Sequence, residues 1–341
     1  MSDVFNNTIL LHQQGAFSRG GYSITISKEP WRKTISMQTF TQDLAQFGPQ
    51  APPPNTPMTL RRAKKYCRQL ARRHYENFTV ASFLLPRRLK QHFCNVYAYC
   101  RWADDLADET GDPKKSLALL GWWETQLRDC YRGRASHPVF LALAETIETF
   151  EIPADPFIDL LVAFRQDQRV TRYETIDQIL EYCRYSANPV GRLVLYLGEC
   201  FSAERARLAD SVCTGLQLAN FCQDVARDWE RGRIYLPMTD CQRFGYAEAS
   251  FEKRECNDAF RRLLAVEVEQ AEGFLRAGLP LVKSVPPELQ LDISLFIHGG
   301  LAILQAVRKL NFDVWTRRPT VAKMEKFRLL AQCWWRLKTG K

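Results

Sequence analysis

Residues 102–108 read WADDLAD, and a second stretch, QDVARD, repeats the spacing of its acids. The first stretch holds Asp104 and Asp108, and the second holds Asp224 and Asp228. Residues four apart lie on one face of an α-helix, so each pair presents two carboxylates side by side. Such a like-charged pair costs roughly 0.2–0.5 kcal/mol, and we expect a cation between its members. Mg²⁺, or Mn²⁺ in its place, suits carboxylate oxygens and takes further ligands from water and substrate phosphates.

Each aspartate pair continues a polar stripe through apolar sequence. Tyr97 and Arg101 share a helical face with the first pair, and Gln217 and Asn220 share one with the second. Asp105 points about 100° away from its pair, so we expect it to support the pair or to face solvent. One acidic pair alone is more often a solvated helix face. Two copies, each extending a polar stripe through apolar sequence, favour a common ligand, because buried polar groups need partners.

Composition places the chain among globular proteins with a sizeable core. It has 341 residues, 46% of them hydrophobic, and a formal net charge of +9. Its 11 cysteines are odd in number and form no CxxC pair, so we interpret them as reduced thiols of a cytoplasmic protein. The positive charge fits diphosphates, nucleic acid or an acidic membrane surface. The sequence gives no indication of oligomeric state.

The periodicity predicts an all-α fold. Residues 1–57 lack sustained periodicity and end in the proline-rich GPQAPPPNTP, so we expect a flexible N-terminal extension. Residues 58–341 show apolar positions three and four apart between short turns, as in an all-helical domain. Helix starts are expected at Pro86, at Asp155, which would cap the helix, and at Thr175, which forms a capping box with the glutamine three residues later.

Three features allow two interpretations each. Pro189 in SANPVG marks either a turn between helices or a kink that widens a cavity. Arg101 either pairs with the aspartates of its own helix or contacts a diphosphate through its planar donors. The basic run after the second acidic stretch is either a solvated face or a phosphate site, and Arg233 is its best-held member because the apolar turn IYLP follows it.

Basic and aromatic residues near the two ends of the helical domain suggest a membrane surface as partner. The run RRAKKYCRQLARR, residues 61–73 with Leu60 before it, fits a solvated helix face or an acidic membrane. The C-terminal stretch EKFRLLAQCWWRLKTGK mixes basic residues with Phe327, Trp334 and Trp335, which fits interfacial contact or a docked helix. We expect a cytoplasmic protein with peripheral contact at the inner face of the membrane.

Other ligand classes lack their sequence signatures. No Gly-rich phosphate loop, GxSxG or HExxH occurs, and no GxGxxG supports a nicotinamide cofactor. The five histidines show no metal-ligand spacing. No zinc-finger or RNP-type pattern accompanies the basic run, so we expect no nucleic-acid partner.

Three long motifs, in order, resemble the squalene/phytoene synthase family of head-to-head prenyl transferases. They are SFLLPRRLKQHFCNVYAYCRWADDLADE, YCRYSANPVGRLVLYL and GLQLANFCQDVARDWERGRIYLP, and the resemblance covers roughly residues 60 to 310. Within the family the last two motifs are most similar to the bacterial hydroxysqualene synthases of hopanoid biosynthesis. The resemblance implies an isoprenoid-synthase-type helical bundle around a central cavity. It also implies that presqualene diphosphate is ionised and that water captures the cation, giving hydroxysqualene and diphosphate.

The resemblance assigns roles to residues at matching positions. Four aspartates hold the Mg²⁺ ions, four residues line the reacting end or act in the chemistry, and four others contact the substrate. The metal ligands are Asp104, Asp108, Asp224 and Asp228; the candidate catalytic residues are Tyr97, Arg101, Asn220 and Gln217; the substrate contacts are Ser82, Phe83, Tyr185 and Arg233.

Two positions depart from the family pattern. Gln223 stands where many squalene synthases carry arginine, which argues against binding two diphosphates in the same way. Cys222 stands where hydroxysqualene synthases often carry tryptophan. The rival hypotheses are condensation of two farnesyl diphosphates to presqualene diphosphate or squalene, and a non-catalytic lipid-binding or assembly factor on the same fold.

Overall fold

The computed structural model describes residues 40–53, 56–73 and 86–339. In these ranges the regular structure is helical, which confirms the all-α prediction. The helices are α3 (Leu60–Arg73), α5 (Arg87–Asp108), α6 (Pro113–Tyr131), α7 (Pro138–Phe150), α8 (Asp155–Gln166), α9 (Ile176–Ser186), α10 (Asn188–Leu197), α11 (Ala203–Glu230), α12 (Met238–Phe244), α13 (Glu248–Glu252), α14 (Asp258–Ala277), α15 (Pro280–Ser284), α16 (Pro287–Lys309) and α17 (Lys323–Thr339).

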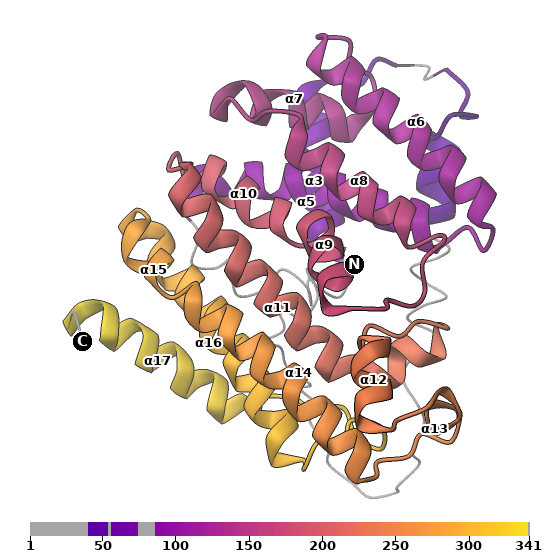
Figure 1. The fold of residues 1–341 in the computed structure, drawn as a ribbon. Helices are drawn as coiled ribbons and strands as arrows, with labels where there is room; N and C mark the ends of the chain where they lie inside the picture. Colours follow the sequence, from indigo (N-terminus) through magenta and orange to yellow (C-terminus); the bar gives the residue numbers. More distant parts are fainter. Residues whose placement is uncertain (1–39, 54–55, 74–85, 340–341) are drawn as a thin grey trace, which may run out of the picture.

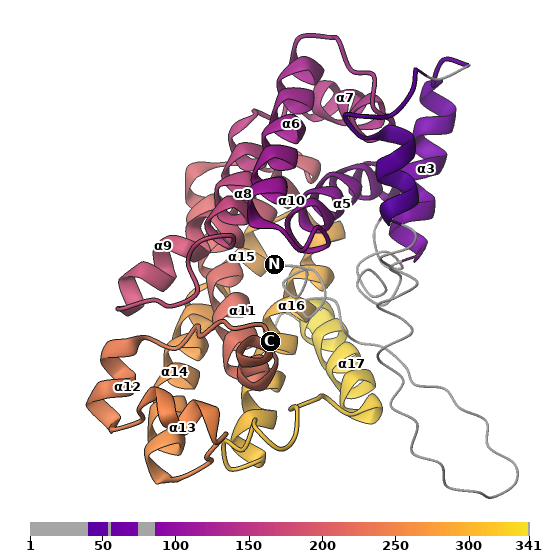
Figure 2. The ribbon, with the colours of Figure 1, turned by 90° about the vertical axis from the view of Figure 1, so that its right-hand side faces the viewer.

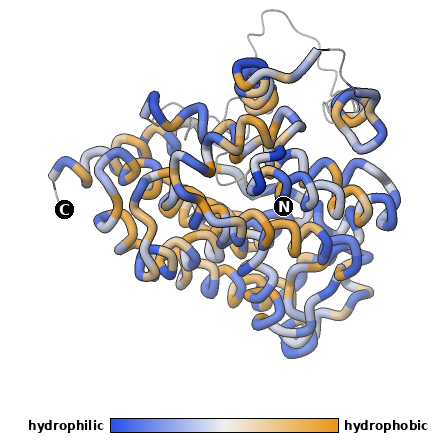
Figure 3. Tube along the Cα trace, turned by 90° about the horizontal axis from the view of Figure 1, so that it is seen from above, coloured by the Kyte–Doolittle hydropathy of each residue, from blue (hydrophilic) through white to orange (hydrophobic). Residues whose placement is uncertain are grey.

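The helices pack around two large apolar clusters. One cluster lies among α3, α5, α6, α7, α8 and α10, and the other lies mainly among α9, α11, α12, α14 and α16. In Figure 1, α3 to α8 run from indigo to magenta and α11 to α14 from red to orange, and α10 and α11 adjoin where the groups meet. Seen from above, apolar and polar segments alternate along the helices, as expected of amphipathic helices (Figure 3).

Helix α11 carries the second acidic stretch and packs against α10, α14 and α16. Its approach to α14 is close because Gly215 faces Leu275, where an added Cβ would lie 2.8 Å from the leucine amide nitrogen. Arg88 ties the start of α5 to the turn after α10, through Glu199, and to the start of α16, through Glu288. The helices that carry the two acidic stretches are therefore held in one framework.

The structure refines three expectations about helix boundaries. Ala187 breaks the segment between α9 and α10, and Pro189 lies in the first turn of α10, so the turn interpretation holds. Thr175 caps α9 by accepting a hydrogen bond from the Gln178 amide, as predicted. The prediction that Asp155 caps α8 is wrong, because Asp155 is the first residue of the helix and the cap position is Ala154, which makes no side-chain hydrogen bond.

Packed residues also precede the expected start of the domain at residue 58. Residues 40–47 are helical, and Phe40 is buried against the ring of Trp102 with the centroids 5.7 Å apart. Asp43 accepts a hydrogen bond from the Tyr66 hydroxyl at 3.0 Å. These contacts correct the expectation of a flexible extension over residues 1–57 for the part that the structure describes, while residues 1–39 lie outside it. Figure 2 shows this segment beside α3.

Candidate active site

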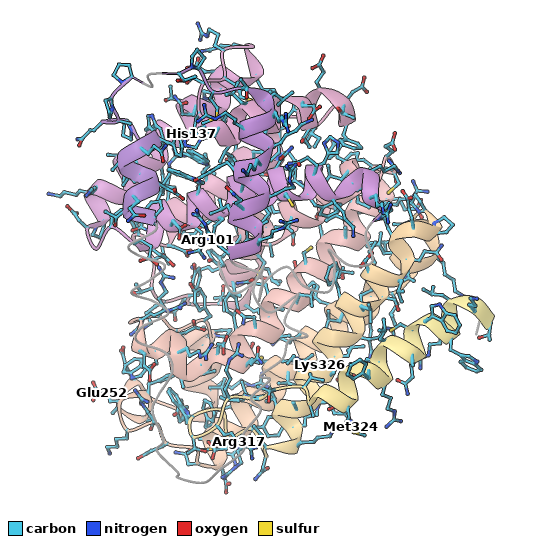
Figure 4. All side chains as sticks on the ribbon, turned by 180° about the vertical axis from the view of Figure 1, so that it is seen from behind. Arg101, His137, Glu252, Arg317, Met324 and Lys326 are labelled. Carbon is cyan, nitrogen blue, oxygen red and sulfur yellow. The ribbon has the colours of Figure 1, made fainter. Side chains whose placement is uncertain are left out.

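The first acidic stretch forms the last turns of α5. Asp104 is 6% exposed, whereas Asp108 is exposed at the end of the helix. Arg101 lies one turn earlier, where the N-terminal and central helices meet (Figure 4). Its Nη1 lies 3.5 Å from Asp104 Oδ2. The helix thus offers one buried carboxylate, already facing a guanidinium, and one open carboxylate.

Asp105 is the main partner of Arg101. Arg101 Nε donates to Asp105 Oδ2 at 3.0 Å, and Nη2 donates to Oδ1. Asp105 is 4% exposed, which corrects the solvated alternative and supports its role as a supporting acid. Burial raises the pKa of Asp105 to about 7, although the Arg101 guanidinium opposes that rise. The intrahelical interpretation of Arg101 therefore describes this structure, and its contact with a diphosphate stays a prediction.

The second acidic stretch lies where α11 kinks. Asp224 has non-helical backbone angles, with φ −110° and ψ 19°, and is 1% exposed. Arg318 donates to it twice, from Nε to Oδ1 at 2.5 Å and from Nη2 to Oδ2 at 2.9 Å. Asn220 Nδ2 also donates to Asp224 Oδ2 at 3.0 Å, as their shared stripe predicts. A bidentate arginine thus stabilises this buried carboxylate.

Gln223 connects α11 to the segment between α16 and α17. Its Nε2 donates to the Pro319 carbonyl oxygen at 2.6 Å, and its Oε1 accepts from Arg318 Nη2 at 3.3 Å. Gln223 is 2% exposed. Gln223 is therefore a neutral structural link, and the positive charge beside Asp224 comes from Arg318.

Arg233 links the ends of the two acidic helices. Its Nη2 lies 3.8 Å from Asp108 Oδ1 of α5. Its backbone N–H donates to the Asp228 carbonyl oxygen of α11 at 2.8 Å. The contact with Asp108 therefore brings the segment after α11 close to the end of α5.

A buried carboxylate that the sequence analysis did not single out lies beside Arg233. Asp167 is 6% exposed, and its backbone carbonyl accepts from Arg233 Nη2 at 3.4 Å. Its Oδ2 accepts from the Tyr182 hydroxyl at 3.1 Å. Burial raises the pKa of Asp167, and Arg233 and the Tyr182 hydrogen bond both oppose that rise.

The remaining candidate residues differ in what surrounds them. Tyr97 is 3% exposed on α5 and packs near Phe296 of α16. Gln217 is 2% exposed on α11, and its Oε1 has no hydrogen-bond partner in the part of the chain that the structure describes. Tyr185 is half-buried on α9, with the Arg184 guanidinium 5.4 Å from its ring centroid. Its role as a substrate contact stays a prediction. Ser82 and Phe83 lie outside the described residues.

The donor set fits Mg²⁺ that is shared with a substrate. Among the described residues, no three His, Cys, Asp or Glu side chains are gathered as a ready-made cage. Mg²⁺ commonly binds through one or two carboxylates and completes its shell with water and substrate phosphates, so such a cage is not required. Asp104 and Asp224 each face a guanidinium, so a metal ion bound there would share these carboxylates with Arg101 and Arg318. The four aspartates could hold the metal on this basis.

Sequence patterns could not have identified Arg318. It lies in the segment between α16 and α17, far along the chain from its partner Asp224. No helical spacing connects the two residues, so only the fold brings them together. Asp292 of α16 was also missed, although it is 4% exposed and its two carboxylate oxygens have no hydrogen-bond partner among the described residues. The only sequence signal for Asp292 is an acid followed by a largely apolar stretch.

Comparison with known families identifies the class of protein. The family model for squalene/phytoene synthase matches residues 71–325, and the chain belongs to that family. Family members use prenyl diphosphates, which agrees with acids and arginines brought together at the ends of α5 and α11.

Individual relatives give a finer comparison. The chain is 45% identical to the crystal structure of squalene synthase HpnC from Alicyclobacillus acidocaldarius, with a TM-score of 0.72 over 75% of this chain and 97% of that one. A dehydrosqualene synthase crystallised with a ligand is 28% identical, with a TM-score of 0.74 over 82% and 98% of the two chains. The phytoene synthase of Arthrospira platensis is 26% identical over 82% of this chain and 95% of its own length.

Proposed function

We propose that this enzyme ionises presqualene diphosphate with Mg²⁺ and captures the cation with water, giving hydroxysqualene and diphosphate. The reaction is a carbon–oxygen lyase step in squalene and hopanoid biosynthesis. Support comes from the hydroxysqualene synthase-like motifs and from the 45% identity to squalene synthase HpnC. We expect Mg²⁺, or Mn²⁺ in its place, and no nicotinamide cofactor.

The observation that carries the proposal is the neutral side chain at position 223. Presqualene diphosphate has one diphosphate, whereas condensation of two farnesyl diphosphates requires sites for two. Gln223 is buried, and its amide is engaged by Pro319 and Arg318. Gln223 itself supplies no cation for a second diphosphate, and the guanidinium beside it, that of Arg318, is already paired with Asp224. This arrangement favours the substrate with a single diphosphate.

The side chains suggest a division of labour. Mg²⁺ held by Asp104, Asp108, Asp224 and Asp228 would supply Lewis-acid stabilisation of the leaving group. Arg233 presents a positive charge to the leaving diphosphate where the ends of α5 and α11 come together. Its placement would favour the charge that grows on diphosphate oxygens as the carbon–oxygen bond breaks.

The capture step needs an acceptor that positions one water in apolar surroundings. Gln217 Oε1 is buried and has no hydrogen-bond partner among the described residues. A water donating to this oxygen would satisfy it and would be held near the cation. Tyr97 and Asn220 lie on the same polar stripes and are the other candidates. Arg101 is a positioning residue in this scheme, because it orders Asp104 and Asp105.

A product assay separates this proposal from its rivals. Purified protein and Mg²⁺ are incubated with presqualene diphosphate in one arm and with farnesyl diphosphate in the other. The second arm is run with and without NADPH, and the products are identified by mass spectrometry. Hydroxysqualene from presqualene diphosphate alone is the expected result. Presqualene diphosphate or squalene from farnesyl diphosphate would favour the condensation hypothesis. Absence of turnover on every prenyl diphosphate would favour the non-catalytic lipid-binding or assembly factor.

We place the reaction in the cytoplasm, at the inner face of the membrane, with no nucleic-acid partner. The substrate carries long hydrocarbon chains, and the uncharged product partitions into lipid. Among the described residues, α16 alone is long and apolar enough to cross a membrane, and 56% of its apolar window is buried inside the protein. Surface contact therefore suits the fold better than a spanning helix.

A further inference from the structure

The outer face of α17 carries an apolar stripe that no element of the described part of the chain covers. Met324 is 83% exposed, Phe327 71%, Trp334 50% and Trp335 55%. Their spacing of i, i+3, i+10 and i+11 keeps them on one face of the helix. Cys333, on the opposite face, is buried at 1% exposure. Figure 4 shows Met324 at the outer edge of the molecule.

The inner face of α17 accounts for its attachment to the body of the protein. The helix packs against α16, and Lys309 of α16 pairs with Glu325 at 3.4 Å. His298 of α16 contacts Arg336 with Nη1 and Nε2 2.9 Å apart. The outward stripe is thus extra apolar surface that the fold does not need for docking this helix.

Charge around the stripe indicates what covers it. Helix α17 contains five basic residues and a single acid, Glu325. Lys338 Nζ lies over the Trp334 ring, 4.6 Å from its centroid, so a positive charge lies directly against the stripe. Arg328 lines a groove between α14, α16 and α17 whose other arginines, Arg276 and Arg308, are both paired with Glu272. Lysine is depleted at protein–protein contacts, whereas tryptophan bordered by lysine and arginine is typical of a lipid interface.

We propose that the stripe of Met324, Phe327, Trp334 and Trp335 docks the protein on an acidic lipid bilayer, with α17 lying parallel to the surface. Seventeen residues of helix span about 25 Å at 1.5 Å per residue, which is long enough for an interfacial helix. The apolar side chains enter the boundary between headgroups and acyl chains, and Arg328 and Lys338 meet the lipid phosphates. The inference rests on the proposed function only for the biological reason to be at a membrane, since docking itself requires no turnover.

Vesicle flotation of the full-length protein tests the proposal. The probes are vesicles of phosphatidylcholine alone and of phosphatidylcholine with one third phosphatidylglycerol. We expect binding to the acidic vesicles that weakens with salt, because surface attraction to anionic lipid is screened. Trp334→Ser with Trp335→Ser should reduce binding at least about tenfold, since two interfacial anchors are lost. The matched control is Phe201→Ser, another exposed aromatic (42%) that lies outside α17.

A charge pair of variants gives a second, independent readout. Lys338→Glu should weaken binding to acidic vesicles several-fold and leave binding to neutral vesicles unchanged. Arg132→Glu, at a site 63% exposed after α6, should change neither. Equal binding by the stripe variants and their controls would overturn the proposal. A wild-type dimer in sedimentation that the tryptophan variants dissociate, with vesicle binding unchanged, would overturn it in favour of a second copy. Product assays in detergent report on the proposed function separately.

Discussion

The Arg318 guanidinium lies across the carboxylate of Asp224, with Nη2 2.9 Å from Oδ2. The two residues join the kink of α11 to the segment between α16 and α17. A carboxylate that is 1% exposed needs such a partner, because its desolvation costs several kcal/mol. Arg318 therefore fixes the orientation of the Asp224 carboxylate and compensates its buried negative charge.

Removing Arg318 should destabilise the protein when no other cation is added. Arg318→Met leaves Asp224 buried without its guanidinium, and we expect a loss of about 3–5 kcal/mol in the free energy of unfolding. Urea unfolding in buffer with a chelator measures it. The control is Arg128→Met, which breaks the exposed pair with Glu124 and should cost less than about 1 kcal/mol. Similar losses in the free energy of unfolding for both variants would contradict this prediction, because the buried pair would then contribute no more than an exposed one.

Asp105 should act through Arg101 and leave metal binding largely unchanged. Asp105→Asn removes the charged acceptor of both guanidinium bonds, so Arg101 is expected to lose its fixed orientation. We expect kcat to fall about 10–100-fold, in the range of a lost positioning contact. The Mg²⁺ concentration at half-maximal rate should stay near that of the wild type. In Asp104→Asn that concentration should rise strongly. A rise of the same size in Asp105→Asn would instead identify Asp105 as a metal ligand.

Stability should fall as pH rises because of Asp292. Burial raises its pKa from 3.8 to about 7. At pH values below the pKa of Asp292 in the unfolded chain, the carboxyl is protonated in both the folded and the unfolded chain. Its contribution to the free energy of unfolding is therefore fully present there. Between that value and about pH 7 the unfolded chain releases a proton that the folded chain keeps, and stability is lost. Three pKa units correspond to at most about 4 kcal/mol.

Comparison of Asp292→Asn with wild type by urea unfolding at pH 5 and pH 8.5 measures this contribution. The variant should lose less stability than the wild type between the two pH values, because the amide does not titrate. Asp258→Asn, at a side chain 86% exposed, serves as the control and should follow the wild type. A wild-type profile that is flat over this range, or unchanged by Asp292→Asn, would contradict a raised pKa at Asp292. Glu267, whose pKa burial raises to about 8, contributes in the same direction.

Close packing of α11 on α14 should depend on the absence of a Cβ atom at Gly215. Gly215→Ala would place a Cβ 2.8 Å from the Leu275 amide nitrogen, so backbone must move at a cost of about 1–3 kcal/mol. Gly273→Ala is the matched control, because nothing lies within 4 Å of its added Cβ. That change should stabilise the helix by about 0.5–1 kcal/mol. Thermal unfolding should shift the two variants in opposite directions, and equal shifts would contradict the packing described.

Local spacing made parts of this structure predictable. The cap of α9 at Thr175 and the hydrogen bond from Asn220 to Asp224 depend on residues three or four apart, which the helical repeat determines. For Asp105, helical spacing predicted only part of the outcome. Its position beside the stripe was predicted correctly, but whether that side faced solvent or protein depended on helices elsewhere in the chain.

Contacts between distant segments were beyond sequence reasoning. Arg318 meets Asp224 across the fold, and the Tyr182 hydroxyl meets Asp167 between α9 and the end of α8. Phe40 packs on Trp102 although a proline-rich stretch separates its helix from α3. No periodic pattern links these partners, because their proximity follows from helix packing.

The central claim is that aspartates of α5 and α11 grip one metal–diphosphate group. A double-mutant cycle on Asp104→Asn and Asp224→Asn tests it, with the affinity for Mg²⁺ and inorganic diphosphate measured by calorimetry on variants checked for folding by circular dichroism. If both residues serve one cluster, the double variant should lose less affinity than the sum of the single variants, with a coupling of about 0.5–3 kcal/mol. Losses that add to within about 0.3–0.5 kcal/mol, as for independent sites, would contradict the shared site.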